Sequence, residues 1–153
     1  MSRGLRFALL AAALLAGYLV YRSCRREDEA AIRGVIQEMI AAAEERNAAE
    51  FMRHFSSQYK DNRGNNFLVI FQMVKRTFEQ VAEIQVRVED VSVVVTGEQA
   101  FVTLSVATTA RGQGQVLYPF GREDSPEHPR ITFRKERFDW KIVQVEGVEQ
   151  GGL

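Results

Sequence analysis

The apolar residues in the first half of the chain recur with the period of an α-helix. Over 32–43 they fall at i, i+3, i+4, i+7, i+8 and i+11, which is one stripe of an amphipathic helix. Asn47 belongs to the residue types that cap helices, and it predicts a second, short helix over 48–59. The polar run 60–66 predicts a turn, and renewed apolar spacing predicts a third helix over 66–83.

After Glu83 the period changes from 3.6 residues to two, which indicates β-strands. Apolar and polar residues alternate over 84–88 and again over 91–95, but the parity slips by one residue near Asp90. Because such a slip turns the apolar side chains to the opposite face, we expect a bulge or sharp bend there, as a strongly curved sheet requires. The same alternation predicts further strands over 100–111, 116–120, 130–139 and 140–148.

A nearly uninterrupted apolar run precedes the first amphipathic stripe. It extends over 5–21 with Arg6 as its only charge, and as a helix it would span roughly 25 Å. A bilayer core is about 30 Å thick, but flanking arginines can extend to the headgroups and the bilayer can thin locally. We therefore predict a transmembrane helix with basic flanks over 1–26. Its expected residues at the membrane interface are Arg6, Tyr21, Arg22, Cys24, Arg25 and Arg26.

The same run could also be a cleaved signal peptide or the leader of a bacterial lipoprotein. Both need small residues just before the processing site, whereas Tyr21 and Arg22 precede Ser23 and Cys24. An uncleaved signal anchor is the favoured interpretation, with a cleaved signal second and a lipoprotein third. Cys24 is interpreted as an unmodified thiol, with acylation or a cross-link between protomers as the alternatives.

The short N-terminal tail favours a single-pass protein of the bacterial inner membrane, with its domain in the periplasm or outside the cell. A cytosolic domain on a reversed anchor is the alternative. No proline lies between Arg22 and Arg46, so the membrane helix can run directly into the first amphipathic helix. The elements together predict one α+β domain over 27–148 and a frayed tail over 149–153.

The charge distribution separates the two parts of the chain. Residues 1–26 carry five arginines and no acid, whereas the rest carries 15 basic and 20 acidic residues, a net charge of −5. An acidic domain is a poor nucleic-acid binder, and the basic end suits an anionic membrane surface. The single cysteine excludes an intrachain disulfide, and no Cys/His cluster has metal-ligand spacing, so no metal or cofactor is expected.

Four stretches carry a resemblance to a known family. They are "AAAEERNAAEFMRHF", "YKDNRG", "GEQAFVTLSV" and "DWKIVQVE", in this order along the chain. From about Ala30 to Val148 the sequence resembles the nuclear transport factor 2-like superfamily, which includes ketosteroid isomerases and SnoaL-like cyclases. The resemblance implies a cystatin-like cone of helices on a bent sheet, an apolar pocket and dimers through the outer sheet face. The pocket-lining candidates are Met39, Phe55, Tyr59, Phe71, Phe101 and Trp140.

The resemblance also implies one catalytic candidate. Asp61 in "YKDNRG" matches the position of the isomerases' general base, but the matching position for their tyrosine donor is Met39, which has no donor group. The simpler interpretation of Asp61 is a turn aspartate that accepts backbone N–H bonds. His54 and His128 have no nucleophile or second ligand near them in the sequence.

These observations favour a binding module over an enzyme. We predict a membrane-anchored, non-catalytic binding or assembly module with an apolar cone pocket for a protein or a small apolar ligand. A small-molecule isomerase or cyclase that uses Asp61 as its base is the alternative.

Overall fold

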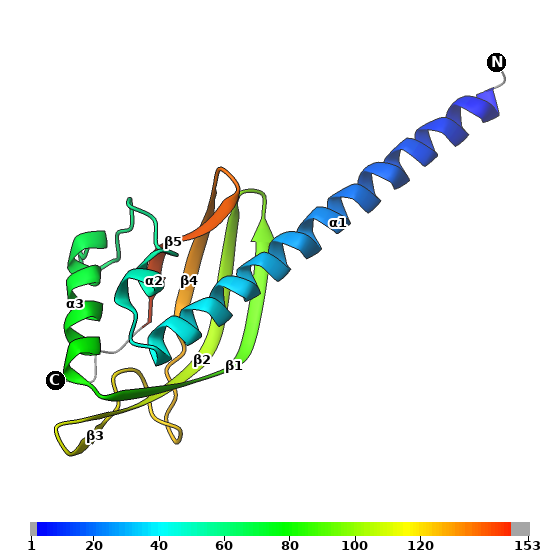
Figure 1. The fold of residues 1–153 in the computed structure, drawn as a ribbon. Helices are drawn as coiled ribbons and strands as arrows, with labels where there is room; N and C mark the ends of the chain where they lie inside the picture. The colour runs from blue at the N-terminus through cyan, green and yellow to red at the C-terminus, as the bar shows by residue number, and fades with distance from the viewer. Residues whose placement is uncertain (1–2, 148–153) are drawn as a thin grey trace.

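The computed structural model describes residues 3–147, and only the backbone of residues 3–8 (Figure 1). Helix α1 (Arg3–Glu44) is one continuous helix of 42 residues. It passes from the apolar run into the amphipathic stripe without a break, as the absence of proline predicted. The predicted frayed tail, 149–153, lies outside the described residues.

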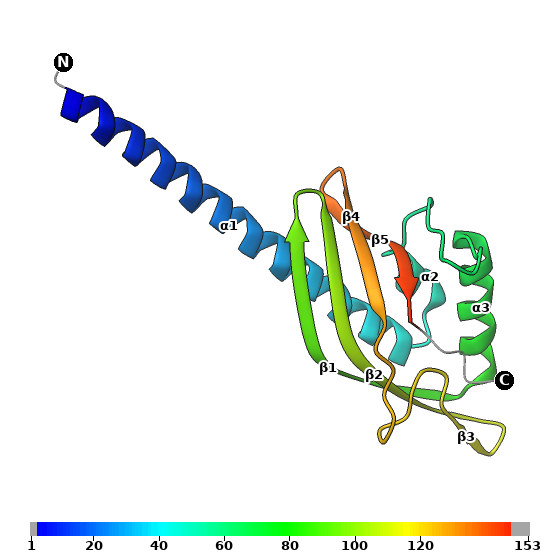
Figure 2. The ribbon, with the colours of Figure 1, turned by 180° about the vertical axis from the view of Figure 1, so that it is seen from behind.

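The two halves of α1 have different surroundings. Its N-terminal half projects clear of the domain (Figures 1 and 2), and every side chain over 9–26 is exposed. Its C-terminal half packs on the sheet and buries Ile32, Ile36, Ala42 and Ala43. Among the residues whose side chains are described, no helix is long and apolar enough to cross a membrane.

Two further helices follow α1. Helix α2 (Ala48–Met52) is capped by the Asn47 side chain, which accepts a hydrogen bond from the Glu50 N–H at 3.1 Å. It is shorter than the predicted 48–59, because the chain leaves the helix to extend the sheet. The Ile142 N–H donates to the His54 carbonyl at 2.8 Å, and the Ser56 N–H donates to the Ile142 carbonyl at 2.9 Å. A local helical pattern cannot anticipate this pairing with a strand near the end of the chain.

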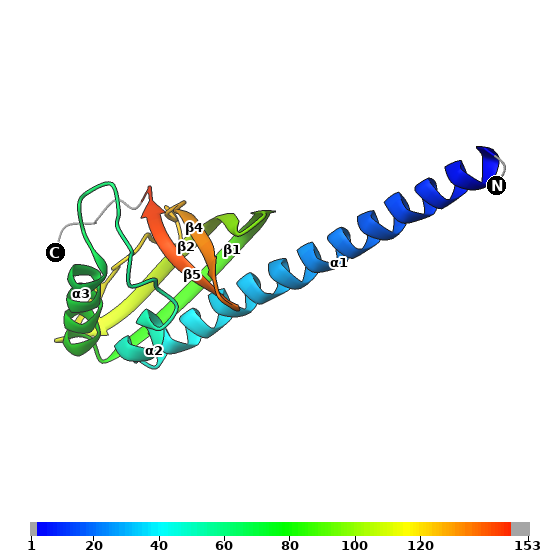
Figure 3. The same ribbon diagram turned by 90° about the horizontal axis from the view of Figure 1, so that it is seen from above.

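Helix α3 (Phe67–Gln80) begins at Asn66, whose side chain accepts from the Val69 N–H. Its apolar residues lie on one face, yet none of its 14 residues is buried. The helix packs chiefly on α2 and stands at the end of the sheet away from the N terminus (Figure 3). Its apolar face is therefore only half covered.

The sheet is antiparallel and lies on one side of the three helices, with strand order β1-β2-β4-β5 and β3 paired to β2. The strands are β1 (Glu83–Thr96), β2 (Gln99–Gly112), β3 (Gln115–Leu117), β4 (Arg130–Glu136) and β5 (Asp139–Glu146). The predicted bulge is confirmed. The β1–β2 register shifts between Glu89 and Ser92, and Asp90 has a positive φ of 53°. The shift keeps the valines on both sides of Asp90 on the inner face.

The sheet is not strongly curled, so the expectation of strong curvature was wrong. Strong curling needs bulges or glycine kinks repeated along neighbouring strands. The β1–β2 pair has one register shift, the β4–β5 pair has one between Thr132 and Phe133, and the β2–β4 pair has none. The fold is therefore a cystatin-like α+β layer of helices on a gently bent sheet.

The hydrophobic core lies between α1, α2 and the inner face of the sheet. Phe133 and Ile142 are almost completely buried on the paired strands β4 and β5. The other large side chains with under 2% exposure come from each layer, namely Ile32, Met52 and Val102. Burial of this apolar surface is the main force that joins helices to sheet.

Candidate functional site

The catalytic candidate Asp61 lies in the turn before α3. Its Oδ1 accepts the backbone N–H groups of Arg63 and Asn65, both at 2.9 Å, and its Oδ2 accepts the Asn65 amide at 2.8 Å. Partial burial raises the pKa of Asp61, but the hydrogen bonds from Asn65 and Arg63 outweigh this and lower it below the ordinary 3.8. A carboxylate stabilised in this way is a weak base near neutral pH. The contacts match those of a turn aspartate.

Tyr59 lies two residues before Asp61 and interacts with its charge. It is 4% exposed, and burial together with the Asp61 charge raises its pKa to about 12, against an opposing backbone hydrogen bond with Val145. The phenol therefore stays protonated in water at any ordinary pH. Met39, at the position implied for a donor, is a half-buried residue packed against the core.

The pocket-lining candidates do not all lie on the inside of the fold. Phe55 and Trp140 are buried core residues, and Phe71 is half-buried on α3. Phe101 was wrongly assigned, since it lies on the outer face of β2 and is 40% exposed. Apolar residues occupy three successive positions at 100–102, so alternation in that segment does not reveal which face is buried.

Half-buried aromatic rings of α2 and α3 form an apolar wall against the core. Phe51 meets Phe78 edge to face with 5.8 Å between the ring centroids, and Phe67 stacks on Phe71 at 6.3 Å. All four rings are half-buried and belong to the core or pack against it. An apolar wall with residual exposure can bind an apolar ligand or an apolar surface of a partner.

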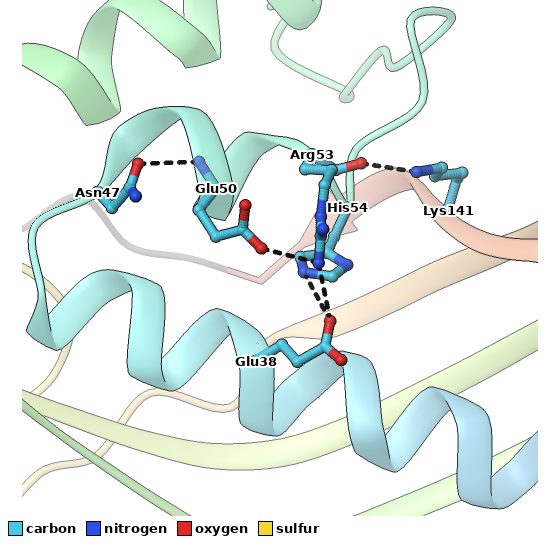
Figure 4. A network of polar contacts seen from close by, with 6 residues as sticks. All are labelled: Glu38, Asn47, Glu50, Arg53, His54 and Lys141. Atoms are coloured by element: carbon cyan, nitrogen blue, oxygen red, sulfur yellow. Dashed lines mark hydrogen bonds and ion pairs between the residues drawn. The ribbon is translucent and has the colours of Figure 1, made fainter.

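A network of charged groups joins α1, α2 and β5 around His54 (Figure 4). The His54 Nε2 lies 3.3 Å from Glu38 Oε2, although the pair lacks the alignment of a hydrogen bond. Arg53 contacts Glu38 at 3.2 Å and Glu50 at 2.7 Å, and its carbonyl accepts from Lys141 Nζ at 2.7 Å. Burial lowers the pKa of His54 below 6.5, and the Glu38 charge opposes this shift. The ring is therefore mostly neutral at pH 7.

Sequence patterns did not predict the group that anchors α1 to the sheet. Asp28 Oδ1 accepts from Lys135 Nζ at 2.7 Å and from Trp140 Nε1 at 3.1 Å. The Asp28 hydrogen bond, with a smaller contribution from its charge, raises the pKa of Lys135. We call these three side chains the Asp28 latch. Only a tertiary contact between residues more than 100 positions apart could reveal it.

Other polar side chains form structural contacts. Ser105 Oγ lies 3.1 Å from His128 Nδ1 and 3.3 Å from Asp90 Oδ2 on the outer face of the sheet. The serine lies between the histidine and the aspartate. A serine nucleophile instead needs the histidine between itself and the carboxylate, so these three side chains do not form a catalytic triad. Within residues 9–147 no three His, Cys, Asp or Glu side chains are arranged to bind a metal ion.

The membrane-interface candidates lie along the projecting half of α1. Tyr21, Arg22, Cys24, Arg25 and Arg26 are all exposed, whereas the side chain of Arg6 lies outside the described residues. The Arg25 guanidinium lies 5.8 Å from the centre of the Tyr21 ring. These residues form a collar between the apolar arm and the domain.

Comparison with known proteins places this geometry in a family. The family model of the SnoaL-like domain matches residues 32–147. No curated protein matches the sequence at a significant level.

Solved structures with the same fold include two from Novosphingobium aromaticivorans. One carries a provisional assignment as a scytalone dehydratase (TM-score 0.70, 13% identity, 86% of this chain and 89% of that one). The other is a nuclear transport factor 2-like protein with a cystatin-like fold (TM-score 0.66, 17% identity, 88% and 90%). Bd1075 of Bdellovibrio bacteriovorus is also similar (TM-score 0.64, 17% identity). The match includes 82% of this chain but only 41% of the longer Bd1075 chain. At these identities the likeness establishes the fold alone.

Proposed function

The chain belongs to the SnoaL-like domain family, and we propose that it is a membrane-anchored, non-catalytic binding or assembly module. The observation that carries the proposal is the exposed apolar arm of α1, which continues without a break into the core of the domain. Leu14 is 75% exposed and Val20 64% exposed, with apolar neighbours on every side of the helix. A continuous apolar surface of this kind requires a partner, and lipid is the partner that the flanking arginines and tyrosines suit.

The length and flanks of the arm agree with this role. The 13 residues 9–21 rise about 20 Å, and the apolar run begins before them at Leu5. The arginine collar at 22–26 would lie among the headgroups. With the N terminus inside, the domain would face the periplasm or the cell exterior.

Membrane association can be tested with two matched leucines. Leu14 lies in the arm at 75% exposure, and Leu68 lies on α3 at 67% exposure. Arginine in the middle of a membrane helix costs about 2.5–3.5 kcal/mol, so Leu14→Arg should release the protein from native membranes under alkaline carbonate extraction. Leu68→Arg should leave it in the membrane pellet. Release of the unaltered chain by carbonate would contradict the proposal. So would mass spectrometry of the membrane-purified protein that shows a chain from which the arm has been cleaved.

The hydrogen bonds and the lowered pKa of Asp61 support the non-catalytic part of the proposal. The enzyme alternative needs this carboxylate as a base with a raised pKa in an apolar site, whereas three hydrogen bonds lower its pKa. Carboxyl-carbon NMR of the full chain in detergent should therefore give a pKa below 3.8 for Asp61. A value raised toward neutrality would restore the isomerase or cyclase hypothesis.

The proposed module could also self-associate through the outer face of the sheet. Val94 and Phe101 are cross-strand neighbours there, with exposures of 51% and 40%. Sedimentation of the full chain in detergent should show a dimer that Phe101→Arg dissociates, with Leu68→Arg as the matched control. A monomer at every concentration would remove this part of the proposal. The half-covered aromatic wall between α2 and α3 is the proposed position of an apolar ligand or partner segment.

A further inference from the structure

The β4–β5 hairpin ends in the most exposed large apolar side chain among those described, Phe138, at 93%. Phe133, on the same hairpin, is fully buried at 0%. The turn residues Arg137 and Phe138 lie beyond the last paired residues, Glu136 and Asp139. The phenyl ring thus has no role in the packing of the domain.

Turn chemistry does not account for these two residues. Arg137 has a φ of +59°, in the left-handed region that side chains other than Gly, Asn and Asp rarely adopt. The corresponding residue of the β1–β2 turn is Gly97, with a φ of +60°, and that of the β2–β3 turn is Gln113, with a φ of +51° and Gly114 after it. Arg137 therefore adopts a left-handed backbone conformation that glycine provides in the β1–β2 turn, and the exposed Phe138 follows it.

The hairpin lies at the end of the sheet from which the arm of α1 departs (Figures 1 and 2). The Lys135 N–H donates to the Glu98 carbonyl at 2.8 Å, which joins the end of β4 to the β1–β2 turn. Lys135 Nζ binds Asp28, so the hairpin is also tied to α1. This contact sets the level of the hairpin along the helix.

The helix geometry places the tip close to the arginine collar. Asp28 lies six residues beyond Arg22, which is about 9 Å along an α-helix. The chain continues three residues from Lys135 to Phe138, at about 3.3 Å per strand residue. The headgroup layer of a bilayer is about 5–7 Å deep on each side. With the collar among the headgroups, the tip therefore comes within reach of the same layer.

From these contacts we propose that Arg137 and Phe138 form a second membrane contact, which docks the domain against an anionic bilayer. The Phe138 ring inserts at the level of the headgroups and the upper acyl chains, and Arg137 binds lipid phosphate. The inference rests on the proposed function, because the arm supplies the first contact. Two contacts fix the orientation of the domain relative to the bilayer, whereas the arm alone would let the arm and the domain tilt and rotate together.

The test uses the full chain in vesicles of phosphatidylcholine and phosphatidylglycerol. With Cys24→Ser as the background, an environment-sensitive fluorophore is attached at Asp139→Cys beside the intact tip, or at Gln113→Cys in the turn at the other end of β2. Both positions are exposed. A third preparation carries the fluorophore on the native Cys24. Lipids with nitroxide headgroups then quench the fluorophores that lie at the membrane surface.

We expect quenching at positions 24 and 139 and none at 113. Phe138→Ser in the Asp139→Cys chain should weaken the docking equilibrium of the hairpin by about tenfold or more. Quenching at position 139 should fall accordingly. Quenching at 24 with none at 139, or no response to Phe138→Ser, would overturn the inference and leave the proposed anchor intact. Absence of quenching at 24 would remove the anchor and the second contact together. Since Phe138 is 93% exposed, its substitution should leave the fold unchanged.

Discussion

The Asp28 latch gives the sharpest expectation about how α1 is joined to the domain. Asp28 Oδ1 accepts one hydrogen bond from a lysine and one from the indole of Trp140, which is 3% exposed. Asp28→Ala removes the acceptor for both donors. Asp28→Asn keeps an acceptor for the indole and removes only the negative charge.

The two variants should differ in magnitude. The Lys135 side chain is 35% exposed, so solvent screens its ion pair, and the loss of that pair costs about 1 kcal/mol. An indole N–H left buried without a partner costs a further 1–2 kcal/mol, approximately. We therefore expect about 2–3 kcal/mol of destabilisation for Asp28→Ala and about 1 kcal/mol for Asp28→Asn. Glu27→Ala, on the exposed side of the same turn of α1, should change stability by less than about 0.5 kcal/mol.

Amide hydrogen exchange of the full chain in detergent tests this expectation locally. The amides of residues 24–32 should exchange faster in Asp28→Ala, because the helix no longer has its contact with β4 and β5, whereas the amides of the β2 centre should change less. Urea unfolding gives the global value. Equal free energies of unfolding for Asp28→Ala and Glu27→Ala, with unchanged exchange at 24–32, would show that the Asp28 latch does not stabilise the packing of α1 on the sheet.

Three further expectations concern the domain itself. Phe133→Ala should destabilise it by about 3–5 kcal/mol in urea unfolding, whereas Phe138→Ala on the same hairpin should have little effect, since their exposures are 0% and 93%. Because burial lowers the pKa of His54, the unfolded chain binds a proton first, so stability should fall as the pH drops below about 6.5, and His54→Gln should flatten that slope. Gly121→Ala should cost more than Gly97→Ala, although both have a φ near 60°. A Cβ at 121 would lie 2.5 Å from a backbone carbonyl, while nothing lies within 4 Å at 97.

The elements that the sequence predicted are those with local causes. The parity slip at Asp90 is visible in the alternation of valines, and the structure has a register shift and a positive φ there. The cap at Asn47 likewise depends on a hydrogen bond three residues along. The predicted length of α2 was wrong because residues after Met52 pair with β5 and do not continue the helix. The strand residues that form this pairing lie about 90 positions away in the sequence.

The candidate site was less predictable for the same reason. Asp61 could be interpreted as a turn residue, because its partners are two and four positions away. His54 gave no local signal, since its burial depends on Glu38 from α1 and on the neighbouring strand β5. Phe101 was assigned to the wrong face because three apolar residues in a row conceal the alternation.

The continuity of α1 links these observations into one physical picture. A helix without a linker fixes both the distance and the rotation between its two ends, at about 1.5 Å and 100° per residue. The buried Ile32 and Ile36 set the rotation of the domain about this axis, and Asp28 fixes the last turn before the arm. The side of the sheet that carries Phe138 is therefore determined by the same helix that carries the arginine collar. The apolar arm and the hairpin tip belong to one rigid body. The position that the arm takes in a bilayer therefore also determines what the tip contacts.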